Sequence, residues 1–205
     1  MLLHTPPTRY GLRPDLGVIA VQIAPNTRVL DIGCGNGDLM EVLQSNKDCD
    51  ARGMEIDPEL VAECVARGLS VVQGDAERDL ADYPDEAFDY AVLGQTLQTA
   101  QRPDLLLGEL MRVGRTAFVS FPNFAHWRTR AALLWGGRMP VTRALPVSWY
   151  ETRNIHHVTV ADFEALAAAM GVAIRRRWFF SGGKAVGGPG ANWRAEFALY
   201  ELGQG

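Results

Sequence analysis

The sequence predicts a doubly wound α/β fold, with a mostly parallel seven-stranded sheet, helices on both faces and an antiparallel last strand. Three observations predict it. Short apolar runs alternate with stretches of helical periodicity along residues 14–120. A turn with three glycines at alternate positions joins the first apolar run to its helix. Acidic or polar residues directly follow several runs, at the strand ends where parallel sheets bind ligands.

Length and composition favour one domain over residues 1–205. Hydrophobic residues make up 47% of the chain, enough for a core, and no run is long enough to span a membrane. The three cysteines are odd in number and show no metal-ligand spacing, so we expect neither a disulfide framework nor a metal site. With no secretory leader at the amino terminus, these features predict a cytoplasmic protein without a membrane partner.

Charge is unevenly distributed along the chain. Residues 1–111 contain 8 Lys or Arg against 19 Asp or Glu, a net charge of −11; residues 112–205 contain 12 against 5, a net charge of +7. This asymmetry fits an acidic partner for the second half, and equally fits solvated arginines that cover apolar surface. No Lys/Arg tract with interleaved aromatics occurs, so nucleic acid is not an expected partner.

The glycine turn is the first candidate site. After a lead-in over residues 1–12 that we expect to be mobile, a helix begins at Pro14 and a buried strand covers 28–32. The strand enters the pattern Asp31-x-Gly33-x-Gly35-x-Gly37. Glycines allow positive φ and a close approach of a ligand to the backbone. A purely structural turn is the alternative.

This pattern resembles motif I of the class I S-adenosylmethionine-dependent methyltransferases. The resemblance implies S-adenosylmethionine or S-adenosylhomocysteine as cofactor, with Asp31 serving its ammonium group directly or through water. A dinucleotide oxidoreductase is not favoured, because the final glycine of G-x-G-x-x-G is missing.

The second strand, expected over 51–56, ends at the next candidates, Glu55 and Ile56. A carboxylate at this strand end can accept hydrogen bonds from both hydroxyls of a ribose; a surface acid is the alternative. Asp57 and Pro58 then suit the N-cap and first position of a helix that ends near Gly68.

Two further strand ends carry candidates. After the strand at 69–73, Asp75 can accept from an adenine amino group while the backbone N–H of Ala76 meets a ring nitrogen, although a loop Asp is more often a turn former. Gln95 follows the strand at 88–94. A helix from Pro103 and a strand at 115–120 complete the parallel set.

Residues 121–158 interrupt the strand–helix rhythm. Aromatic, His, Pro and Arg residues concentrate there, and we interpret the segment as a lid or substrate-side insert with a short helix over 127–134. His126, Tyr150 and His156 are candidate general bases, or else packed structural residues.

The end of the chain supplies the last elements. Thr159 should cap a helix that stops at Gly171. A strand is expected over 172–180, a flexible hairpin loop over 181–190, and a final antiparallel strand over 193–200. The loop lacks the Gly-Lys-Ser/Thr of a phosphate loop.

Residues 14 to about 180 resemble the MetW family. The specific segments are Leu12-Arg13-Pro14-Asp15-Leu16, Gln95-Thr96-Leu97-Gln98, Ser120-Phe121-Pro122-Asn123-Phe124 with His126-Trp127, Gly137-Arg138-Met139-Pro140-Val141-Thr142, and Trp149-Tyr150 through Asn154-Ile155-His156. The resemblance implies a Rossmann-like class I methyltransferase fold, a place in methionine biosynthesis, and association with homoserine O-acyltransferase. We therefore expect a cofactor-binding accessory or regulatory partner of that enzyme. An active methyltransferase on a small molecule is the alternative.

Overall fold

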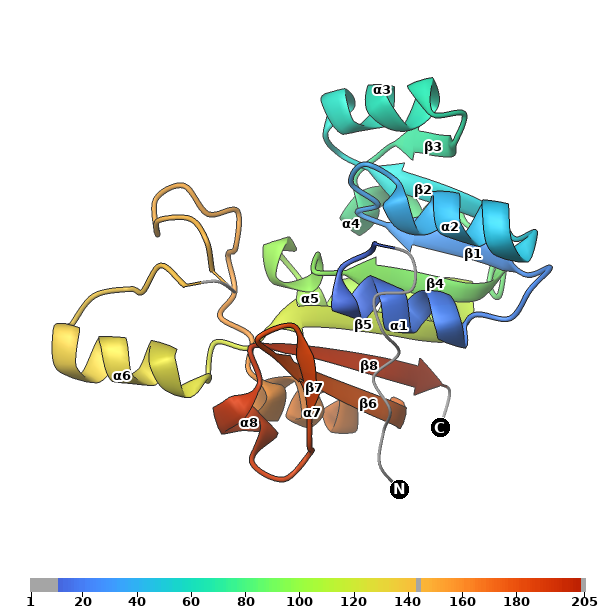
Figure 1. Ribbon diagram of the computed structural model, residues 1–205. Helices are drawn as coiled ribbons and strands as arrows, with labels where there is room; N and C mark the ends of the chain where they lie inside the picture. The colour runs from blue at the N-terminus through green and yellow to red at the C-terminus, as the bar shows by residue number, and fades with distance from the viewer. Residues whose placement is uncertain (1–10, 143–144, 204–205) are drawn as a thin grey trace.

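A mixed sheet of eight strands forms the centre of the computed structural model, which describes residues 11–142 and 145–203 (Figure 1). The strand order is β3-β2-β1-β4-β5-β8-β6-β7. The strands are β1 (Arg28–Ile32), β2 (Asp50–Glu55), β3 (Ser70–Gln73), β4 (Phe88–Gly94), β5 (Gly114–Pro122), β6 (Ala173–Ser181), β7 (Lys184–Val186) and β8 (Phe197–Gly203). β1 to β5 are mutually parallel. β8 runs antiparallel between β5 and β6, and β7 pairs antiparallel with β6.

Helices cover both faces of this sheet. They are α1 (Pro14–Gln22), α2 (Asp38–Lys47), α3 (Pro58–Ala66), α4 (Ala76–Asp79), α5 (Pro103–Val113), α6 (Trp127–Gly136), α7 (Val160–Ala169) and α8 (Ala191–Arg194), with 3-10 turns η1 (Leu80–Asp82) and η2 (Leu97–Thr99). Two apolar cores result: Ile19 of α1 and Leu43 of α2 belong to one, Leu107 of α5 and Phe163 of α7 to the other. The doubly wound fold predicted from the sequence is confirmed.

The expected helix starts are also present. Pro14, Pro58 and Pro103 each lie in the first turn of their helix. The side chain of Asp57 accepts from the N–H of Glu59 and caps α3, and the Thr159 hydroxyl accepts from Asp162 and caps α7. Local proline and capping signals therefore mark the starts of four helices that cover the sheet: α1, α3, α5 and α7.

The strand count differs from the expected seven, because the 181–190 segment contains β7. Ser181 pairs with Lys184, so only Gly182 and Gly183 connect β6 to β7. Both glycines have positive φ, +58° and +75°, which is the geometry of a two-residue hairpin turn that matches the twist of its strands. The segment is thus a strand hairpin rather than only a loop.

The expected strand over 193–200 begins later than predicted. Trp193 lies in α8, and β8 starts at Phe197. The guanidinium carbon of Arg130 lies 5.3 Å from the centroid of the Trp193 ring. Trp193 therefore packs against a residue of α6 and does not pair in the sheet. The expected mobile lead-in falls mainly on residues 1–10, which lie outside the described residues; Leu12 is buried beside α1.

Candidate functional site

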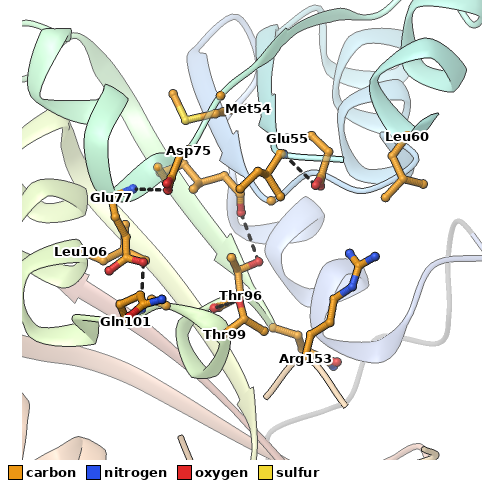
Figure 2. A pocket seen from close by; sticks show the side chains of 17 residues that line it. Met54, Glu55, Leu60, Asp75, Glu77, Thr96, Thr99, Gln101, Leu106 and Arg153 are labelled. Atoms are coloured by element: carbon orange, nitrogen blue, oxygen red, sulfur yellow. Dashed lines mark hydrogen bonds between the residues drawn. The ribbon is translucent and has the colours of Figure 1, made fainter. Parts of the chain in front are cut away.

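A cavity of about 430 Å³ opens at the carboxyl ends of the parallel strands. Segments that follow β1, β2, β3 and β4 form its walls, and the insert between β5 and α7 adds one residue, Arg153 (Figure 2). Six of the nine cofactor candidates line it: Gly33, Glu55, Ile56, Asp75, Ala76 and Gln95. Residues from four strand ends, far apart in sequence, therefore meet at one cavity.

The three glycines of the turn have different structural roles. All three have positive φ. A Cβ on Gly33 would lie 2.3 Å from Oγ1 of Thr96, and one on Gly37 would lie 2.3 Å from Cδ1 of Leu69, so these two positions permit close packing. A Cβ on Gly35 would meet nothing within 4 Å. Gly35 thus leaves open space next to the backbone, but neither Gly35 nor Gly37 is among the residues that line the cavity.

Glu55 fixes the turn to the end of β2. Its Oε2 accepts from the N–H of Gly35 at 2.9 Å, and its Oε1 accepts from the N–H groups of Ile56 and Asp57 at 2.9 and 3.1 Å. The carboxylate is buried and held in place by three backbone donors. Each carboxylate oxygen has two lone-pair directions, and both on Oε1 are used, so one direction on Oε2 remains to accept from a ligand.

Asp31 is buried behind the glycine turn rather than in the cavity wall. It alternates with Leu30 and Ile32 along β1 and so points toward the α1 side of the sheet. Burial raises the pKa of Asp31 to about 7, while the nearby Arg13 guanidinium lowers the pKa and Glu55 and Asp15 raise it. A carboxyl group with this pKa can gain or lose a proton near neutral pH.

Gln95 lies between the main cavity and a smaller one. The smaller cavity, about 200 Å³, is lined by Arg13, Asp15 and Glu196 among others, and Gln95 contributes to both. Gln95 has φ +60°, a conformation that non-glycine residues adopt at a cost and that often marks a functional site. Arg13 and Asp15 were not predicted as site residues; Arg13 lies within a segment that carries the family resemblance.

Asp75 has the structural role that the alternative interpretation gave it. Its side chain accepts from the N–H of Glu77 at 3.1 Å and caps α4, and its own N–H donates to Asp79. Ala76 occupies the first position of α4, where a backbone N–H has no partner within the helix. Asp75 and Ala76 also line the cavity. The capping role of Asp75 therefore does not prevent either residue from contacting a ligand there.

Arg153 is the main cavity residue that sequence reasoning missed. Its guanidinium pairs with the carboxylate of Asp57 at 3.3 Å, next to the end of β2. In Figure 2 it approaches the cavity from the side opposite Asp75 and Glu77. Its place inside the predicted lid segment was the available signal. Thr96, Thr99 and Gln101 also line the cavity without having been proposed.

The three candidate bases do not line this cavity. His126 is buried, and its Nδ1 accepts from the N–H of Arg128 at the start of α6; burial lowers its pKa. Tyr150 is exposed and packs edge-on against Trp149. His156 has Nε2 3.3 Å from the carbonyl oxygen of Gln101 and lines a separate hollow near α7. The structure therefore brings none of them to the proposed cofactor site.

Within residues 11–142 and 145–203, no three or more His, Cys, Asp and Glu side chains gather in a way that could hold a metal ion. None of the helices described there combines the length and apolar character of a membrane span.

The fold is that of the Rossmann-like S-adenosylmethionine-dependent methyltransferases. An S-adenosylmethionine-dependent methyltransferase from Thermotoga maritima superposes with a TM-score of 0.67 at 17% identity, covering 96% of this chain and 90% of that one. The [4+2]-cyclase SpnF superposes with a TM-score of 0.67 at 16% identity, covering 92% of this chain and 80% of that one. The second comparison illustrates that a named activity does not follow from this fold alone.

The chain belongs to the MetW family. Residues 13–202 match the family described as methionine biosynthesis protein MetW. The bifunctional methionine biosynthesis protein MetXA/MetW of Rhodopirellula baltica is 32% identical over 183 residues, which cover 85% of this chain. The chain spans only 29% of the length of that relative.

Proposed function

We propose that this chain binds S-adenosylmethionine or S-adenosylhomocysteine and acts as an accessory or regulatory partner of homoserine O-acyltransferase. The observation that carries the proposal is the relative in which a MetW counterpart and MetXA share one polypeptide. Covalent fusion holds two modules at high effective concentration, which favours modules that work together.

The cavity supports cofactor binding. In this proposal Glu55 accepts from a ribose hydroxyl, and Asp75 with the Ala76 N–H meets the adenine; that all three residues line the cavity supports these roles. The methionine end would then lie by Gly33 and Gln95, with Asp31 behind them. The open space beside Gly35 leaves room for the ligand next to the turn.

The accessory role is preferred to methyl transfer because of the family match, the fused relative and the charge asymmetry of the chain. His126, Tyr150 and His156, the candidate bases for methyl transfer, do not line this cavity. S-Adenosylmethionine forms from the product of the pathway, so cofactor occupancy of this chain would report end-product level to the acyltransferase. Such a signal requires that the cofactor-bound and cofactor-free chains differ in affinity for the partner.

The test measures homoserine acylation by the matching acyltransferase, with and without this chain and with and without S-adenosylmethionine. We expect the chain to raise the activity or to change its response to the cofactor. Glu55→Ala should remove the cofactor response, because it removes the ribose acceptor and loosens the turn. Glu63→Ala, an exposed carboxylate of α3, is the matched control and should behave like the natural chain.

Two outcomes contradict the proposal. If the chain neither binds the acyltransferase nor alters its activity, the accessory role is wrong. If the two proteins associate with equal affinity with and without S-adenosylmethionine, the sensing role is wrong while the association stands.

A further inference from the structure

Exposed apolar side chains concentrate on one projecting part of the molecule. We call it the arm and define it as α6 with the following loop, residues 127–142 and 145–150. Of the fifteen large hydrophobic side chains that are exposed among the described residues, nine lie in the arm. Figure 1 shows α6, in yellow, extending away from the edge of the sheet. Large apolar patches of this kind mark interaction surfaces.

Three consecutive large side chains at the end of α6 are exposed within the part of the chain that the structure describes. Consecutive helical residues point about 100° apart, yet Leu133, Leu134 and Trp135 are exposed by 45%, 77% and 81%. The buried residue of α6 is Thr129, in the first turn. Together these side chains span about 200° of the helix circumference, so a flat surface cannot cover all three and a partner that does so needs a groove around the helix end.

The charge of the arm restricts the chemistry of that groove. Residues 127–150 contain four arginines and no Asp or Glu. Arg128 pairs with Glu196 and Arg130 lies over the Trp193 ring, whereas Arg138 is exposed directly after α6 and is the arginine we assign to the partner contact. Guanidinium groups beside an apolar contact pair best with carboxylates, so the complementary groove is apolar and bordered by Asp and Glu side chains.

We propose that the arm is the surface that docks into such a groove on homoserine O-acyltransferase. This inference rests on the proposed function. In the Rhodopirellula relative, the counterpart of this chain is covalently joined to a much longer remainder. Association between two such modules needs a contact surface on each, and an exposed apolar surface can supply it. Among the described residues, the arm has the apolar area and uniform charge to supply it.

The arm also has a direct connection to the cofactor cavity. Residues 153–156 follow it in the chain, and the first of them, Arg153, lines the cavity. The N–H groups of Ile155 and His156 donate to the carbonyl oxygen of Gln98 at 2.9 and 3.0 Å, and Arg153 pairs with Asp57. Cofactor binding and partner docking therefore act on one continuous segment, which is a physical route for coupling.

The experiment measures the affinity of the full chain for the matching acyltransferase by calorimetry. The double variant Leu134→Ser/Trp135→Ser should weaken binding by about 30-fold or more, since buried aromatic anchors dominate interface energies. Leu105→Ser, at an α5 side chain that is 58% exposed and outside the arm, is the control and should change affinity less than about 2-fold. Circular dichroism and S-adenosylmethionine binding should match the natural chain for both variants.

The charge prediction has its own variant. Arg138→Glu should weaken binding and make the affinity less sensitive to salt, because one favourable pair becomes repulsive. An unchanged salt dependence would overturn the carboxylate-bordered groove.

The outcomes separate this inference from the proposed function. If the natural chain does not bind the acyltransferase, the proposed function itself fails. If it binds and the double variant binds equally well, only the arm is wrong. If acyltransferase binding is unchanged while the double variant abolishes self-association in sedimentation, the arm joins two copies of this chain instead. If the double variant abolishes only binding to phosphatidylglycerol vesicles, the arm is a membrane surface instead.

Discussion

Gly33 and Gly35 have the same backbone conformation but different surroundings. Gly33 packs against Thr96, whereas the space beside Gly35 is open. An alanine substitution at Gly33 therefore tests the packing of the turn, and the same substitution at Gly35 tests ligand access. At both positions an L side chain adds about 1–2 kcal/mol of backbone strain, and at Gly33 it also collides with a neighbouring side chain.

Gly33→Ala should mainly reduce stability, by about 2–4 kcal/mol in urea unfolding. Gly35→Ala should cost only the backbone strain but should weaken S-adenosylmethionine binding by at least about tenfold, because the methyl group occupies the open space. Thr96→Ala, which removes the colliding hydroxyl and methyl groups, should recover part of the Gly33→Ala loss. Equal cofactor affinity of Gly35→Ala and the natural chain would contradict the proposed ligand position.

Asp31 makes the stability of the cofactor-free chain depend on pH. Its pKa is raised from 3.8 to about 7 by burial, so the folded chain holds this proton more tightly than the unfolded chain. The stability contributed by the protonated form is complete below pH 4 and is lost as pH rises to about 7, by roughly 4 kcal/mol at most. Asp31→Asn should therefore raise the melting temperature at pH 8 and leave it unchanged near pH 4.

The same residue should make cofactor affinity depend on pH. An ammonium group beside Asp31 favours the carboxylate, so binding lowers the pKa and releases a proton. Affinity for S-adenosylmethionine should rise between pH 5.5 and 7 and level off above that range, as measured by calorimetry. Asp31→Asn should flatten this profile. A profile that is flat in the natural chain would mean that Asp31 does not face the ammonium group.

At the scale of elements, the segment 153–156 connects the arm to the cavity. Its order depends on two backbone bonds to Gln98 and on the pairing of Arg153 with Asp57. The pairing is largely exposed, so its own contribution to stability is small. We expect the ion pair instead to hold the Arg153 side chain at the cavity mouth.

Arg153→Ala should leave the melting temperature within about 1–2 °C of the natural value, because an exposed ion pair contributes little. It should weaken S-adenosylmethionine binding several-fold and reduce the effect of the cofactor on acyltransferase affinity. Arg102→Ala, which removes an exposed Arg–Asp pair at the start of α5, is the control. If both variants bind cofactor equally well, Arg153 has no part in the site.

At the scale of the whole molecule, the sheet separates two regions with different properties. The carboxyl ends of β1 to β4 carry the cavity, and the insert that follows β5 carries the exposed apolar arm. The strongly acidic first half of the sequence supplies nearly all cavity residues, while the basic second half supplies the arm and Arg153. The charge asymmetry seen in the sequence thus corresponds to a division between the part that forms the cavity and the part that projects from the sheet.

The sequence by itself determined the features that depend on neighbouring residues. Apolar periodicity identified the parallel strands, capping residues placed the starts of α3 and α7, and the spacing of glycines and acids identified six residues of the cavity wall. These signals act within a few residues, through backbone conformation and local hydrogen bonds, so they can be recognised in the sequence without knowledge of the fold.

Only the tertiary structure decided which distant residues meet. It brought Arg153 to the cavity, left His126, Tyr150 and His156 outside it, drew Trp193 into α8 against Arg130, and left the end of α6 uncovered. The physical reason is that contacts between segments far apart in sequence depend on strand order and on the path of a long insert. Neither is encoded in local periodicity, because the same pattern can pack against different neighbours.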